Sequence, residues 1–133
     1  MPTLVAGDLK AQSANATIWD RVYKTAQADR GADLYDRTCS SCHRSDLTGG
    51  EDGAPALRGT PFFLRWKNRS LSELYFVLAE TMPQDAPASL SGKEYADVIS
   101  FILKKNDAAA GESELLPDTE RLKHILFTEK PTP

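Results

Sequence analysis

The segment that most constrains this chain is Cys39-Ser40-Ser41-Cys42-His43, in which a histidine directly follows two cysteines that stand three positions apart. Because one helical turn brings both thiols to the same side, they can reach the two vinyl groups of a single porphyrin, and the histidine can bind the iron. The motif therefore predicts one covalently bound haem c, with thioether bonds at Cys39 and Cys42 and with His43 as an axial ligand. Such a chain must also provide an apolar pocket and a second axial ligand.

Met82 is the candidate for that second ligand. The sequence has two methionines, and the other, Met1, is its first residue. Met82 stands in a Thr-Met-Pro turn, where the proline favours an extended backbone that can direct the sulfur. A thioether favours Fe(II) relative to a second imidazole. Two alternatives stay open: Met82 as an ordinary core side chain, and His124, on a predicted polar helical face, as a rival ligand.

Other residues are candidates for the walls of the pocket. The carbonyl of Pro55, in a glycine-rich loop, can accept a hydrogen bond from the His43 ring and so orient it. Buried haem propionates need charged or neutral hydrogen-bond donors. The candidates for that role are Arg58, Arg65, Trp66 and Tyr75.

The composition indicates one globular core with a slightly acidic surface. The chain has 133 residues, 41% of them hydrophobic, and a net charge of −3 at pH 7. Two propionates would add negative charge, which disfavours nucleic acid as a partner. No apolar run approaches the roughly 18 to 20 residues that cross a bilayer, and the first residues do not resemble a signal peptide. Because haem attachment to this motif usually takes place outside the bacterial cytoplasm, we expect an exported, periplasmic monomer whose signal peptide has been replaced by a start methionine.

The patterning predicts an all-α fold. Helices are expected at 27–39, at 60–66 with Thr60 as cap and Pro61 in the first position, at 71–80, at 95–105 and, as a short element, at 119–127. Ser70 with Glu73, and Ser91 with Glu94, form predicted capping boxes. The loop 47–57 is expected to wrap the haem, and 83–87 is expected to form a second loop. The predicted organisation is an N-terminal arm (1–26) that packs on the body through Ile18, Trp19, Val22 and Tyr23, a haem domain (27–106) and a C-terminal extension (107–133).

Over residues 27–106 the sequence resembles the class I c-type cytochromes. Gly31, Tyr35 and Cys39 match the first helix of that family, Phe101 matches the aromatic residue of its last helix that crosses the glycine, and Met82 matches its sixth ligand. The resemblance implies the class I cytochrome c fold, with about four to five helices around one covalently bound haem. Within the class, Gly-Thr-Pro-Phe-Phe-Leu-Arg-Trp, Glu-Thr-Met-Pro and Ser-Leu-Ser-Gly-Lys-Glu-Tyr-Ala-Asp-Val are similar to the haem domains associated with quinoprotein alcohol and sugar dehydrogenases.

These features favour a soluble electron carrier over an enzyme. In a carrier, iron saturated by His43 and Met82 passes electrons from a periplasmic dehydrogenase to an acceptor such as a terminal oxidase or another cytochrome. A haem enzyme or gas sensor, such as a small peroxidase, needs an open iron position and a polar distal group. A zinc or thiol-redox module would use Cys39, Cys42, His43 and His124, but adjacent residues rarely bind one tetrahedral ion together.

Overall fold

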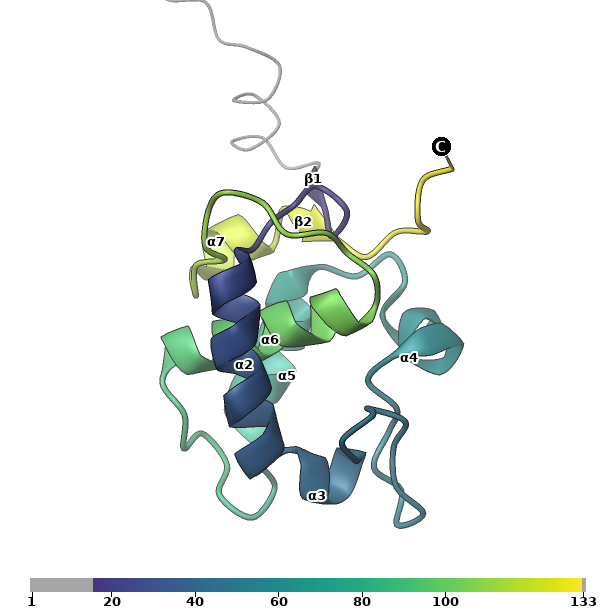
Figure 1. The fold of residues 1–133 in the computed structure, drawn as a ribbon, viewed down its shortest axis with the longest axis vertical. Helices are drawn as coiled ribbons and strands as arrows, with labels where there is room; N and C mark the ends of the chain where they lie inside the picture. Colours follow the sequence, from purple (N-terminus) through teal and green to yellow (C-terminus); the bar gives the residue numbers. More distant parts are fainter. Residues whose placement is uncertain (1–15, 133) are drawn as a thin grey trace, which may run out of the picture.

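The computed structural model describes residues 16–132. Within this range the chain is mainly helical (Figure 1). The elements in order are β1 (Ala16–Thr17), α2 (Thr25–Thr38), α3 (Ser40–His43), α4 (Gly59–Trp66), α5 (Leu71–Thr81), α6 (Gly92–Lys105), α7 (Thr119–Leu122) and β2 (Ile125–Leu126). The all-α class is confirmed, with one two-stranded parallel pair added to it. None of the described helices is long and apolar enough to cross a bilayer.

Helices α2 and α6 cross at Gly31 (Figure 1). A methyl group in place of a Gly31 hydrogen would overlap the carbonyl oxygen of Asp97 and would lie 3.0 Å from Cβ of Phe101. One turn further along α2, the Tyr35 ring packs on the Phe101 ring with 5.2 Å between centroids. The close crossing that the glycine predicted is therefore confirmed, and it fixes the direction in which α2 leads into the Cys39 segment.

The helix starts follow local capping rules in two of the three cases expected. Both capping boxes are present, with the hydroxyls of Ser70 and Ser91 accepting from the backbone N–H of Glu73 and Glu94. The prediction for α4 was wrong in detail: Arg58 is the capping position, Gly59 is the first helical residue, and Thr60 lies inside the first turn. The first N–H groups of a helix lack partners in any case, so a proline fits anywhere in that turn.

The C-terminal segment differs from its prediction. A helix was expected over 119–127, but α7 ends at Leu122, and Ile125–Leu126 pairs in parallel with Ala16–Thr17. The backbone groups of Phe127 instead bond to Asn68 and Arg69, which follow α4. Pairing with distant chain segments thus replaces the last helical turn.

The segments on either side of the expected haem domain contribute to its core. Ile18 and Tyr23 are buried, and Trp19 and Val22 pack against the same cluster, together with Leu115, Leu122 and Phe127 from the other end of the chain. The buried side-chain amide of Gln27 exchanges two hydrogen bonds, of 2.8 and 2.7 Å, with the backbone of Leu115. The part of the predicted arm that precedes residue 16 lies outside the described residues.

Candidate haem site

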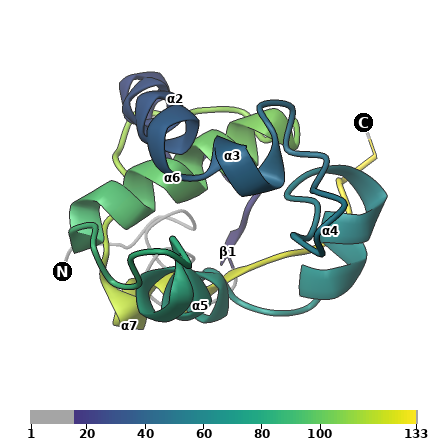
Figure 2. The same cartoon turned by 90° about the horizontal axis from the view of Figure 1, so that it is seen from below.

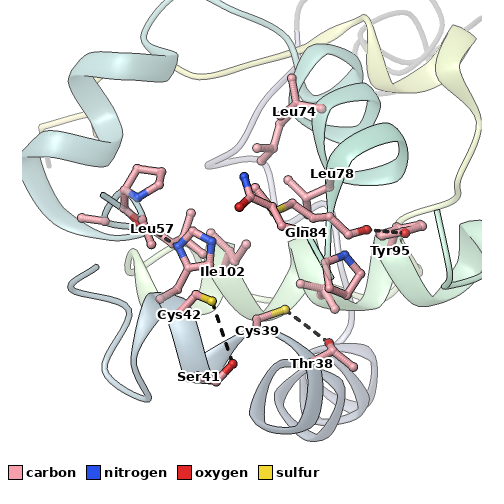
Figure 3. A pocket seen from close by; sticks show the side chains of 18 of the residues that line it. Thr38, Cys39, Ser41, Cys42, Leu57, Leu74, Leu78, Gln84, Tyr95 and Ile102 are labelled. Atoms are coloured by element: carbon pink, nitrogen blue, oxygen red, sulfur yellow. Dashed lines mark hydrogen bonds between the residues drawn. The ribbon is translucent and has the colours of Figure 1, made fainter. Parts of the chain in front are cut away.

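A cavity of about 410 Å³ is lined by residues of α2, α3, α4, α5 and α6. Helices α3, α4 and α5 surround the region that faces the middle of α6 (Figure 2). The walls include the buried apolar side chains of Leu74, Val98 and Ile102. The two cysteine sulfurs lie on one side of the cavity, with Leu74, Leu78 and Gln84 on the other (Figure 3). Volume and lining are typical of a site for a largely apolar cofactor.

The cysteine side of the cavity is built from one short stretch of chain. Helix α2 ends at Thr38, and Cys39 both caps it and begins the single turn of α3. The N–H groups of Cys42 and His43 both donate to the carbonyl of Cys39, at 3.2 and 3.0 Å. This turn places both thiols and the imidazole in the lining of one cavity.

The two thiols differ in their surroundings. Cys39 is half-buried beside the Thr38 hydroxyl, at 3.4 Å, whereas Cys42 is exposed. Burial raises the pKa of the Cys39 thiol above its ordinary value, and the Thr38 hydrogen bond only partly offsets that effect.

His43 is held by the loop that follows it. Its Nδ1 lies 2.8 Å from the carbonyl oxygen of Pro55, which is the hydrogen bond expected from the sequence. Because a carbonyl can only accept, Nδ1 carries a proton, and in the neutral imidazole Nε2 therefore has the lone pair. His43 is 7% exposed and lines the cavity, so its ring is oriented to offer Nε2 as a metal ligand.

Met82 reaches the same cavity from the end of α5. The helix stops at Thr81, as the following proline predicted, and Met82 has the extended backbone angles φ −117° and ψ 149°. Its N–H still donates to Leu78 at 3.0 Å, so the residue remains attached to the helix. Met82, Pro83 and Gln84 all line the cavity.

The fold places only two of the four candidate propionate donors at the cavity. Arg65 and the buried Trp66 line the cavity, but Arg58 and Tyr75 do not. Arg58 precedes α4 and borders a separate hollow of about 360 Å³ with Trp19 and Lys105. Tyr75 is one residue out of phase with Leu74 and Leu78 on α5, and its ring packs edge-on against Tyr95 instead.

Sequence reasoning missed Tyr95, which is 3% exposed and lines the cavity. A signal was available, because at helical periodicity Tyr95 shares one face of the predicted 95–105 helix with the apolar residues Val98, Ile99 and Ile102. The rival ligand His124 lies between α7 and β2 and does not contribute to the cavity. The zinc alternative needed that histidine beside the cysteines.

The residues present fit a haem. The cavity combines two thiols, an imidazole with a free Nε2, a thioether from another element and apolar walls. A soft thioether and an imidazole are ligands that suit haem iron, and the apolar walls suit the porphyrin. The donor set and the apolar lining of the cavity are thus compatible with the prediction made from the motif.

Comparison with known proteins then identifies the family. A family model described as cytochrome C oxidase, cbb3-type, subunit III matches residues 26–102, more than half of the chain. The chain belongs to this family. It is accordingly a class I c-type cytochrome, a haem-binding electron-transfer protein and not an enzyme.

The fold of the cytochrome is shared with a solved structure. A chain of the sulfane dehydrogenase SoxCD from Paracoccus pantotrophus superposes with a TM-score of 0.54 at 19% sequence identity. The match covers 96% of the cytochrome and 66% of the SoxCD chain, so the cytochrome spans about two thirds of that chain. No curated protein matches the sequence.

Proposed function

We propose that this protein is a monohaem electron carrier of the periplasm, with thioether bonds at Cys39 and Cys42 and with His43 and Met82 as the axial ligands. The observation that carries the proposal is that these four residues, from two separate segments of the chain, line a single cavity. Haem, when bound, supplies one-electron chemistry between Fe(III) and Fe(II).

The residues of the chain perform the supporting tasks. Pro55 fixes the proton of His43 on Nδ1, so that Nε2 is presented without a change of tautomer. Leu74, Val98 and Ile102 exclude water from the inner walls, which lowers the local dielectric constant and favours the less charged, reduced state. Arg65 and Trp66 are the proposed donors to the propionates, since both line the cavity.

For the partners, we propose a dehydrogenase as donor and a terminal oxidase or another cytochrome as acceptor. The local similarity to haem domains of quinoprotein dehydrogenases supports such a donor, and the described family supports an oxidase as acceptor. The fold is also found in a chain of a dehydrogenase structure. At 19% identity this match supports the fold alone and gives no support for a particular substrate or partner. Export to the periplasm follows from the usual place of haem attachment to this motif.

The test is the absorption spectrum of protein expressed with a cytochrome c maturation system. We expect a pyridine haemochrome of the c type with one haem per chain. The oxidised protein should show the weak red band of a methionine-ligated haem. Met82→Ala should abolish this band and allow rapid carbon monoxide binding to the reduced protein, while His124→Ala, which removes the other imidazole, should leave both properties unchanged.

Two outcomes would contradict the proposal. A colourless purified protein would exclude the covalent haem. Rapid binding of carbon monoxide to the reduced wild type would show an open iron position, and would favour the haem enzyme or gas sensor over the carrier.

A further inference from the structure

The hydroxyl of Tyr95 holds the residue that carries the proposed sulfur ligand. Tyr95 lies in the first turns of α6, and its hydroxyl donates to the backbone carbonyl oxygen of Met82 at 2.6 Å (Figure 3). The Tyr95 hydroxyl oxygen in turn accepts a longer hydrogen bond, of 3.4 Å, from the backbone N–H of Leu90. One side chain therefore connects the two ends of the 82–90 segment.

Few other hydrogen bonds hold the 82–90 segment in place. The side chains from 84 to 89 are exposed, and its internal backbone hydrogen bond is the one from Ala86 to Pro83. Residues beyond it are firmly placed, because the Ser91–Glu94 capping box begins α6 directly after the loop. The position of Met82 relative to α6 thus depends mainly on the Tyr95 hydroxyl.

Both backbone polar groups of Met82 are engaged, and by different helices. The N–H donates to Leu78 in α5, and the carbonyl accepts from Tyr95 in α6. A shift of the Met82 backbone that withdrew the sulfur from the cavity would break the second bond inside a site where Tyr95 is 3% exposed, and an unpaired buried hydroxyl is costly.

We propose that Tyr95 is a positioning residue that keeps the Met82 sulfur at the iron and so resists its replacement by outside ligands. This inference rests on the proposed function, since it requires Met82 to be an axial ligand. Tyr95 acts through the backbone of Met82 and does not itself bind the iron.

The experiment is a titration of the oxidised holoprotein with imidazole, an external ligand that competes with Met82 and is followed by the visible spectrum. Tyr95→Phe removes only the hydroxyl and keeps the ring. Loss of one hydrogen bond that opposes ligand exchange should raise the apparent affinity for imidazole by roughly 2- to 10-fold. The red band of methionine ligation should also weaken.

Tyr23→Phe is the matched control. Tyr23 is equally buried, and its hydroxyl also donates to a backbone carbonyl, that of Ala108, but it does not line the cavity. Both variants should lower the melting temperature by a similar amount. Only Tyr95→Phe should change the imidazole affinity, which separates positioning from a general loss of stability.

A second measurement needs no variant. The chain has two methionines, so labelling with isotope at the methionine carbonyl introduces only two infrared bands, from Met1 and Met82. Binding of imidazole to the wild type should shift one of them to higher frequency, because the Met82 carbonyl loses its hydrogen bond.

The outcomes separate the two proposals. A wild type without methionine ligation, unchanged by Met82→Ala, would overturn the ligand assignment and this inference with it. A wild type with normal methionine ligation, in which Tyr95→Phe has wild-type imidazole affinity or the carbonyl bands do not move, would overturn the role of Tyr95 alone.

Discussion

On the His43 side of the cavity the chain is held by backbone hydrogen bonds within one loop, whereas on the Met82 side it depends mainly on the hydroxyl of one side chain from another helix. The loop after His43 is closed by bonds from Gly49 to His43 and from Leu57 to Leu47, at 3.0 and 2.8 Å. The 82–90 segment is connected to its surroundings by Tyr95. The two candidate ligands can thus be positioned in different ways, one by the backbone of its own loop and the other by one side chain of a neighbouring helix.

This difference has a functional meaning. Electron transfer requires that neither ligand leave when the iron changes its oxidation state, because movement of ligands slows the reaction. The His43 side meets this requirement through a rigid turn and loop. The Met82 side meets it through one contact to α6, so we expect it to be the first to open under stress.

Met82→His is expected to have the largest effect of the variants that distinguish the two sides. Exchange of a thioether for an imidazole should lower the reduction potential by on the order of 0.1 to 0.3 V, within the roughly 0.8 V that axial ligands cover. The measurement is a spectroelectrochemical titration, with His124→Ala as control. An unchanged potential would mean that residue 82 is not a ligand.

Gly31→Ala tests the helix crossing that connects the two sides, since α2 leads to Cys39 and α6 carries Tyr95. The added methyl group would overlap the Asp97 carbonyl, so we expect a loss of about 3 kcal/mol in the free energy of unfolding. Urea titration measures this, and imidazole affinity should rise as well. Asp33→Ala, at an exposed position on α2, should change neither by much. Equal stability of the two variants would contradict a tight crossing.

Gly49→Ala tests the His43 side alone. Gly49 has a positive φ of 89°, and an added methyl group would lie 2.7 Å from the Ala54 oxygen and 3.1 Å from the Pro55 carbonyl carbon. We expect a loss of about 2 to 3 kcal/mol from strain and overlap together. Gly53 has φ 101° with nothing near the added group, so Gly53→Ala should cost only about 1 kcal/mol of strain.

The spectrum and the reduction potential of Gly49→Ala test whether the His43 side and the Met82 side are independent. Gly49→Ala should shift the reduction potential, because it displaces the carbonyl that orients His43, and the band of methionine ligation should persist. Loss of that band in Gly49→Ala would show that the two sides are not independent.

The smallest effect is expected far from both sides, at Glu114. Its hydrogen bond and ion pair with Arg30, at 2.7 Å, hold the pKa of the carboxyl below its ordinary value of 4.5. A lowered folded pKa stabilises the protein above the ordinary value, and this contribution is lost as the pH falls through the folded pKa. Glu114→Gln should therefore be slightly less stable than wild type at neutral pH, and urea titrations should show this difference shrinking as the pH falls below 4.5. A difference in the free energy of unfolding that instead grows as the pH falls would contradict this prediction.

Local patterns in the sequence predicted the parts of the fold that local interactions build. The capping boxes, the end of α5 before Pro83 and the turn that carries Cys39, Cys42 and His43 all depend on residues within one or two helical turns of each other. The resemblance of Gly31 and Phe101 to the helix crossing of the family predicted a contact between distant helices, and the cost of a mid-helix glycine is consistent with a neighbour that needs the space.

The rest depends on contacts between distant residues, which a single sequence does not display. Arg58 and Tyr75 have suitable chemistry, but the rotation of α5 and the path of the chain before α4 turn them away from the cavity. The helix expected to reach residue 127 stops at Leu122 because strand pairing with residues 16–17, more than a hundred positions away, satisfies the backbone instead. Helical periodicity could have placed Tyr95 at the cavity, but not its hydrogen bond, because the partner is a backbone carbonyl that any residue type at position 82 would supply.

The buried amide of Gln27 has a practical consequence for anyone who wishes to produce this cytochrome. The family match ends at residue 102, yet Gln27 is satisfied by Leu115, and the wall behind Trp66 is completed by Phe127, whose ring centroid lies 6.3 Å from that of the indole. A gene trimmed to the family boundary would encode a polypeptide with an orphaned amide in its interior and an uncovered tryptophan beside its cofactor. Expression plasmids should therefore extend at least through residue 128.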